Sequence, residues 1–195
     1  MTSSWVVFVA VVAAMGCSSS SPAAVDSGVP DAEPDAFPVD PDATITGTVG
    51  GGAFRVGDVL LVHPQTWASG IKGETAILIS STPRLCDQIT SGKTTAPGKF
   101  LIISLEQVPL ATGTFSTTTS PRGDVYFDQV DAQCKFSKDF TNRVQIDVSQ
   151  VGPPVIGTFT AHYQSGDAIT AVFSASASCD EVAVDTYLNR NPTCP

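Results

Sequence analysis

The side chains with the greatest chemical potential in this sequence are five cysteines and two histidines, His63 and His162. Five is an odd number, so at most four cysteines can pair with one another. Their spacing contains no Cys-x-x-Cys pair and does not match the ligand set of a structural zinc site. We therefore expect disulfides, one cysteine with a separate role, no metal ion and no cofactor. The five are Cys17, Cys86, Cys134, Cys179 and Cys194.

Motifs for catalysis are sparse. The sequence has no Gly-x-Ser-x-Gly nucleophile elbow. In an alternating segment, His162 and Phe159 are expected on opposite faces of the strand, so we expect His162 to face solvent. We assign no catalytic residue and expect a protein that is not an enzyme.

The composition of one loop favours the binding of a ligand or a partner. Trp67 stands among small and turn-forming residues in the segment HPQTWASGIKG, residues 63–73. An aromatic side chain in such a loop can anchor a ligand or a partner. Trp67 is therefore the candidate binding residue.

Cys17 follows a short apolar segment. The run WVVFVAVVAA covers residues 5–14, and residues 5–15 carry no charged side chain. A helix that crosses a bilayer needs about 20 apolar residues, so this segment is too short to span one. An apolar core of this length followed by small residues is typical of a secretory signal peptide.

The residues AAMGC resemble the lipobox of bacterial lipoproteins, with the cleavage between Gly16 and Cys17. This resemblance implies that the Cys17 thiol receives a diacylglycerol and that its freed amine is acylated. Residues 1–16 would then be the signal peptide, and Cys17 would hold the protein to a membrane through its lipid. Ser18, in place of Asp, resembles lipoproteins that are sorted onward to the outer membrane. The alternative is ordinary secretion.

The segment 17–43 is expected to be a disordered linker. The tripeptide Pro-Asp-Ala occurs at 30–32, 34–36 and 41–43, and residues 18–43 contain six acids and no base. Proline at this density opposes both helix and strand pairing. An acidic, aromatic-poor composition cannot bury enough apolar surface to fold, so we expect an extended spacer.

The charge distribution bears on the choice of partner. The formal net charge is −9, but residues 44–195 hold 13 acids and 10 bases, so the body is nearly balanced. No cluster of lysine and arginine is present, which argues against a nucleic-acid partner.

Residues 44–195 are expected to form a single all-β domain. Nine segments have strand character, which favours a β-sandwich of eight or nine strands, with a β-barrel as the alternative. Short helices are expected only within 82–92 and 180–190. The expected strands are 44–49, 54–63, 74–80, 99–107, 112–119, 124–130, 143–150, 155–163 and 168–179.

Alternation assigns the faces of the later strands. In RVQIDVSQ, residues 143–150, the valines and the isoleucine are expected to face the core, and Gln145, Asp147 and Ser149 to face outward. Residues 155–163 and 168–179 are expected to form a hairpin. By the same alternation, Cys179 at the end of the last strand is expected to point inward.

Four cysteines in the domain allow three disulfide connectivities. We favour Cys86–Cys134 together with Cys179–Cys194. The second bridge would fasten the final segment to the inward end of the last long strand.

The sequence thus predicts a membrane-anchored lipoprotein whose β domain serves binding or envelope organisation. Its partner would be a protein or a glycan of unknown identity, and the protein would be a monomer. The alternatives are a tethered extracytoplasmic hydrolase that uses dispersed carboxylates, and a subunit of an envelope assembly. A hydrolase of the first kind would require two carboxylates about 5–9 Å apart.

Overall fold

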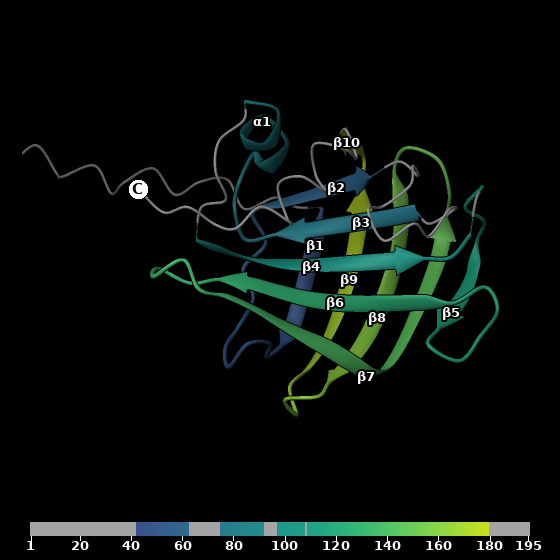
Figure 1. The fold of residues 1–195 in the computed structure, drawn as a ribbon. Coiled ribbons are helices and arrows are strands. Elements are labelled where there is room, and N and C mark those ends of the chain that lie inside the picture. The colour runs from purple at the N-terminus through teal and green to yellow at the C-terminus, as the bar shows by residue number, and fades with distance from the viewer. Residues whose placement is uncertain (1–41, 63–74, 92–96, 108, 180–195) are drawn as a thin grey trace, which may run out of the picture. The chain divides into compact units, whose positions relative to one another are not determined.

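A computed structural model describes residues 42–62, 75–91, 97–107 and 109–179 (Figure 1). These residues form strands and one short helix, which confirms the all-β prediction with little helix. Cys17, His63, Trp67 and Cys194 lie outside the described residues. In the described part of the chain, no helix has the length and apolar character that a membrane crossing requires.

Ten strands are described, one more than the nine segments expected, because the segment 168–179 divides into two strands. The helix α1 covers Leu85–Thr90, within the expected 82–92. The strands are β1 (Ala43–Gly47), β2 (Asp58–Val62), β3 (Thr75–Ser80), β4 (Gly98–Leu105), β5 (Gly113–Ser116), β6 (Gly123–Val130), β7 (Phe136–Gln150), β8 (Val155–Tyr163), β9 (Ala168–Ala175) and β10 (Ala177–Cys179).

All ten strands belong to one curled sheet in the order β1-β9-β8-β7-β6-β4-β3-β2-β10, with β5 paired beside β7. The pairs are antiparallel except for β10 with β2, which is parallel. A single curled sheet corresponds to the barrel alternative rather than to two separate sandwich sheets. The strand β7 makes the curl, because its first half pairs with β6 and its second half pairs with β5 and β8.

The curl gives the sheet two arms. We call β1, β9, β8, β5 and the second half of β7 the polar arm, and β10, β2, β3, β4, β6 and the first half of β7 the apolar arm. Figure 1 shows the strands of the polar arm running behind and across those of the apolar arm. The main core lies between the arms, where buried aromatic residues such as Phe115, Phe159 and Phe173 pack with aliphatic residues from both.

The two arms differ on their outer faces. Alternate residues of β2, β3 and β4 point away from the main core, and they too are apolar, including Leu60, Leu78 and Phe100. The helix α1 packs on this outer face through Leu85 and Ile89, forming a second core. The polar arm instead carries exposed polar side chains on its outer face, as the alternation of residues 143–150 predicts.

A β-bulge at Asn142 divides β7. Thr141 pairs with Tyr163 and Arg143 pairs with His162, so Asn142 is an extra residue without a position in the ladder. Before the bulge, Phe140 is exposed on the outer face; after it, Val144 is buried in the main core. The bulge therefore shifts the alternation by one residue and turns Arg143 outward.

The disulfide connectivity differs from the expected one. Cys86 of α1 is bonded to Cys179 of β10, with Cα atoms 5.7 Å apart. The predicted pairs Cys86–Cys134 and Cys179–Cys194 are therefore wrong. Cys134 is also disulfide-bonded.

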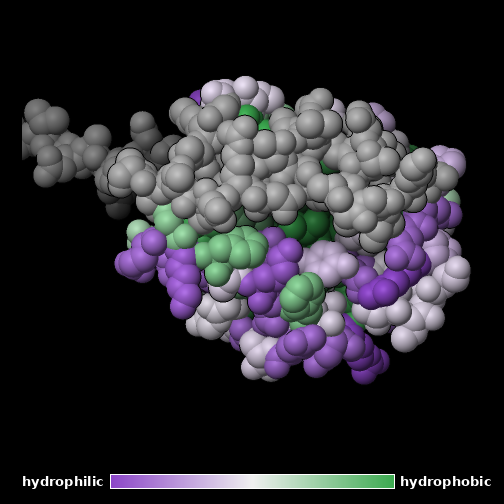
Figure 2. All heavy atoms as spheres, viewed as in Figure 1, coloured by the Kyte–Doolittle hydropathy of each residue, from purple (hydrophilic) through white to green (hydrophobic). Residues whose placement is uncertain are grey.

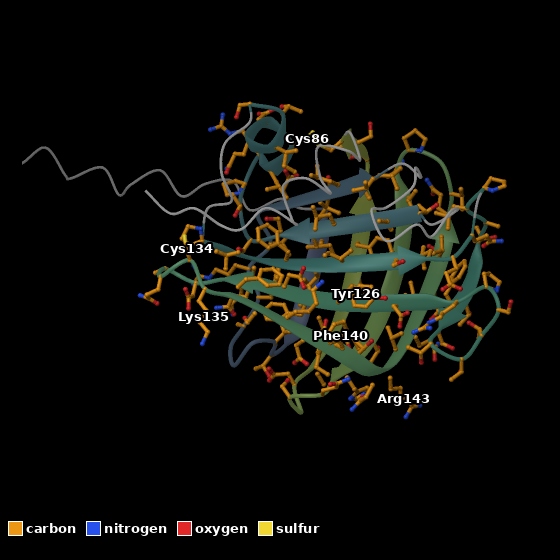
Figure 3. All side chains as sticks on the ribbon, in the orientation of Figure 1. Cys86, Tyr126, Cys134, Lys135, Phe140 and Arg143 are labelled. Carbon is orange, nitrogen blue, oxygen red and sulfur yellow. A yellow bond between two sulfur atoms is a disulfide. The ribbon has the colours of Figure 1, made fainter. Side chains whose placement is uncertain are left out.

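The break in the strand after β9 brings Cys179 to Cys86. Up to Ala175 the expected inward parity is confirmed, but Ala177 is exposed, and Ala177–Cys179 adds to β2 of the apolar arm. Cys179 is buried as expected, but in the second core beside α1. Cys134 lies at the turn between β6 and β7, which Figure 3 shows well away from Cys86.

Candidate functional site

The outer face of the polar arm carries a concentration of polar side chains on neighbouring strands. After the bulge, β7 directs Arg143, Gln145 and Asp147 outward, because the residues between them fill the core. The next strand, β8, directs Thr158, Thr160 and His162 to the same side, because Phe159 and Ala161 are buried.

Antiparallel pairing places these side chains in rows. His162 is opposite Arg143, Thr160 is opposite Gln145, and Thr158 is opposite Asp147. The rows continue onto β9, where Thr170 is opposite Thr160, and onto β1, where Thr46 is opposite Thr170. Directly opposite residues on one face have Cβ atoms about 5 Å apart, so each row presents a set of adjacent polar groups.

Two depressions adjoin on this face and share Arg143 and His162; we call them together the polar groove. The first has a volume of about 290 Å³ and the second of about 250 Å³. The first is lined by Arg143, Gln145, Asp147, Thr158, Phe159, Thr160, His162 and Thr170, and the second by Asn142, Arg143, His162, Tyr163, Gly166 and Asp167.

Asp147 is held in place at one end of the first depression. Thr114 Oγ1 donates to its Oδ1 at 2.5 Å, and Gln145 Nε2 donates to its Oδ2 at 3.0 Å. These two hydrogen bonds, that from Thr114 first, lower the pKa of Asp147 below its ordinary value. The carboxylate therefore remains ionised at neutral pH, and both of its oxygens already have donors.

Asp167, in the second depression, is likewise held by hydrogen bonds. Its Oδ1 accepts from Thr48 Oγ1 at 2.7 Å, and its Oδ2 accepts from the Gly51 backbone N–H at 3.1 Å. These contacts fasten the chain after β1 to the turn between β8 and β9. The Gly51 and Thr48 hydrogen bonds, in that order, lower the pKa of Asp167.

Arg143 and His162 differ from these acids. Both side chains are exposed, and no hydrogen bond or ion pair joins either of them to another described side chain. Arg122, by contrast, is engaged by Asp124 at 2.7 Å, and Lys138 by Asp128 at 3.5 Å. The groove thus offers two donors whose hydrogen-bonding capacity is unused within the described structure.

The outer face of the apolar arm carries a second feature, the aromatic patch of Tyr126, Phe136, Lys138 and Phe140. Phe136 is 41% exposed and Phe140 45%, and the Lys138 Nζ lies 5.9–6.0 Å from the three ring centroids. Figure 2 shows hydrophobic residues among hydrophilic ones on this face. In Figure 3, Arg143 projects away from Tyr126 and Phe140, as the shift in alternation at the bulge requires.

Asp128 lies beneath the aromatic patch. It is 2% exposed, and burial raises its pKa, although Lys138 opposes the rise. Its Oδ1 has no hydrogen-bond partner among the described residues. Within the described residues, no group of histidines, cysteines or acids is arranged to hold a metal ion.

The orientation of some groove residues was predicted from the sequence. Gln145 and Asp147 face outward and His162 is exposed, as expected, whereas the candidate binding residue Trp67 lies outside the described residues. Sequence reasoning did not single out Arg143 or the threonines. In RVQID and TFTAH these residues alternate with residues that face the core. This alternation indicates a shared polar surface only when the two strands are known to be neighbours.

No protein-family model, curated protein or solved structure matches this chain.

Proposed function

We propose that this protein is a lipoprotein that binds an oligosaccharide of the cell envelope in the polar groove. The observation that carries the proposal is the convergence of guanidinium, imidazole, amide and hydroxyl groups from β7, β8 and β9 on one depression of about 290 Å³. Binding pockets are typically concave surfaces with a few convergent polar groups.

The composition of the groove favours a glycan over a protein partner. Protein interfaces are built around buried aromatic or aliphatic anchors. Among the described residues of this face, Val172 is the large apolar residue that is exposed. Phe159, the aromatic residue that lines the groove, is only 1% exposed. Closely spaced hydroxyl, amide and carboxylate groups suit a ligand that itself carries many hydroxyl groups.

The carboxylates support binding rather than hydrolysis. A hydrolase of the two-carboxylate type needs an ionised acid and a protonated acid about 5–9 Å apart. Asp147, whose pKa is lowered, lies on the polar arm, and Asp128, whose pKa is raised, lies on the apolar arm. Asp128 faces Lys138, and Asp147 lies nine positions after Lys138 along β7, about 30 Å of strand at about 3.3 Å per residue.

The cysteines support the lipid anchor. Cys86 and Cys179 pair, and Cys134 is also disulfide-bonded, so the odd total of five cysteines leaves one over. The lipobox-like AAMGC favours Cys17 as the cysteine that remains. Disulfides are typical of oxidising compartments, in agreement with export.

Metabolic labelling with palmitate tests the anchor. The full chain expressed in a bacterium should incorporate labelled palmitate, and Cys17→Ser should abolish the label, because the lipid is attached to that thiol and to its amine. Cys194→Ser is the matched control and should retain the label. Labelling that persists in Cys17→Ser would refute the anchor.

A glycan array tests the groove. The full-length protein in detergent should bind a subset of envelope oligosaccharides, and the double variant Thr158→Val/Thr160→Val should reduce that binding at least tenfold, because two hydroxyls are lost from the groove without a change in side-chain shape. Thr44→Val on β1 is the matched control, since Thr44 lies on the same face but does not line the groove. Equal loss in the control, or no binding of any glycan, would contradict the proposal.

A further inference from the structure

We infer that the ligand of the polar groove is an acidic sugar, and that Arg143 and His162 together bind its carboxylate or phosphate group. This inference rests on the proposed function and specifies its ligand class.

First, the fold places two hydrogen-bond-donating side chains, a guanidinium and an imidazole, next to each other. Arg143 and His162 are directly opposite each other in the β7–β8 register, and both line both depressions. Opposite side chains on one face of a sheet are close enough to contact the same small group. A ligand that occupies either depression therefore meets both residues.

The second step is the absence of an internal counter-ion. The carboxylates that line the groove are Asp147 and Asp167, and the oxygens of each already accept hydrogen bonds from other groups. No described acid lies within ion-pair distance of Arg143. The guanidinium is thus available for an anion supplied by the ligand.

The third step is the chemistry of the donors. A guanidinium binds a carboxylate or a phosphate through two parallel N–H donors, and such charge-assisted hydrogen bonds are stronger than neutral ones. An imidazole has an N–H donor in either protonation state. Beside them, Gln145, Thr160 and Thr170 offer neutral hydrogen-bonding groups for the hydroxyls of the same sugar.

The bulge at Asn142 gives a further reason to assign a role to Arg143. Without the extra residue, the alternation of the first half of β7 would turn Arg143 toward the core. Bulges often lie beside functional sites, where they redirect a side chain. Here the bulge brings Arg143 onto the face that holds His162.

Calorimetric titration of the full-length protein in detergent provides the test. One pair of probes is oligogalacturonate and its methyl ester, in which a neutral ester replaces each carboxylate; the other is a mannose 6-phosphate oligosaccharide and its dephosphorylated form. We expect at least one acidic probe to bind at least tenfold more tightly than its neutral counterpart. The pair that shows this preference identifies the source of the anion as carboxylate or phosphate.

The variants assign the preference to the two residues. Arg143→Gln and His162→Gln should each reduce the ratio of the affinity for the acidic probe to that for its neutral counterpart at least fivefold. Arg143→Lys should retain part of the preference, since it keeps the charge but loses the second donor. Arg55→Gln is the matched control, because Arg55 is exposed but does not line the groove.

The outcomes separate this inference from the proposed function. Equal affinity for acidic and neutral probes, or an equal weakening of both by Arg143→Gln, would overturn the inference and leave an oligosaccharide-binding groove. Failure of all four probes to bind would overturn the inference and the proposed function together.

Discussion

At the scale of single residues, Tyr163 shows how the groove and the core meet. Its side chain is 1% exposed, and its ring packs edge-on against Phe127 at a centroid distance of 6.4 Å. Its hydroxyl has no hydrogen-bond partner among the described residues, and burial, with Asp139 and Asp167 adding to it, raises its pKa. A buried hydroxyl without a partner carries a desolvation cost of about 1–3 kcal/mol.

Replacement of Tyr163 by Phe should therefore stabilise the protein. The ring and its packing remain while the unpaired hydroxyl is removed, so we expect the free energy of unfolding to rise by about 1 kcal/mol. Urea denaturation followed by fluorescence measures this change. Tyr163→Ala, which removes the ring, should lower the free energy of unfolding by about 3–5 kcal/mol. A loss of stability in Tyr163→Phe would show that the hydroxyl has a partner.

At the scale of the elements, β7 and β8 together build the groove, and their close approach depends on Gly157. A Cβ at this position would lie 2.7 Å from the Asp147 backbone oxygen and 2.6 Å from the Phe173 ring. Gly157 is opposite Val148 and Phe173, so it lets the polar arm close over the Phe173 side chain. The spacing of the groove-bearing strands thus requires a residue without a side chain here.

Substitution of Gly157 by Ala should separate these strands. We expect the free energy of unfolding to fall by about 1–3 kcal/mol, because the backbone oxygen of Asp147 cannot move aside as a flexible side chain would. Thermal denaturation of the full chain measures the effect. Gly52→Ala is the matched control, since a Cβ there meets only the Lys99 Nζ at 3.8 Å; it should change stability by no more than about 0.5 kcal/mol. Equal effects in both variants would contradict the steric argument.

At the scale of the whole molecule, the Cys86–Cys179 bridge joins parts of the domain that are distant in sequence. It connects α1, on the outer face of the apolar arm, to β10 at the end of the same sheet, across a sequence separation of 93 residues. The residues between the two cysteines include β4 to β9 and therefore the groove. The bridge closes most of the described fold into a single covalent loop.

Loss of this bridge should destabilise the domain. In the loop-entropy description, a closed loop of this length contributes about 4–5 kcal/mol. We expect Cys86→Ser/Cys179→Ser to lower the free energy of unfolding by that order, as measured by urea denaturation. Peptide mapping without reductant should recover Cys86 linked to Cys179 in the wild-type protein. A linked Cys86–Cys134 peptide would refute the connectivity.

Much of the fold follows from the sequence, because alternation with a period of two is a local property. The strand 155–163 has the predicted bounds, and Phe159 and Phe173 are buried as their parity requires. The first half of β7 was not predicted, since the bulge at Asn142 interrupts the alternation there. The same local pattern identified Gln145, Asp147 and His162 as outward-facing.

The sequence by itself determined the alternating faces of the strands, the odd number of cysteines and the acidic, proline-rich character of the segment before the domain. Only the tertiary structure decided which residues meet. The order of the strands places Arg143 beside His162, and the crossing from β9 to β10 carries Cys179 to Cys86 rather than leaving it for Cys194. The physical reason is that pairing and curl depend on contacts between distant segments, which a local pattern of apolar and polar residues does not specify.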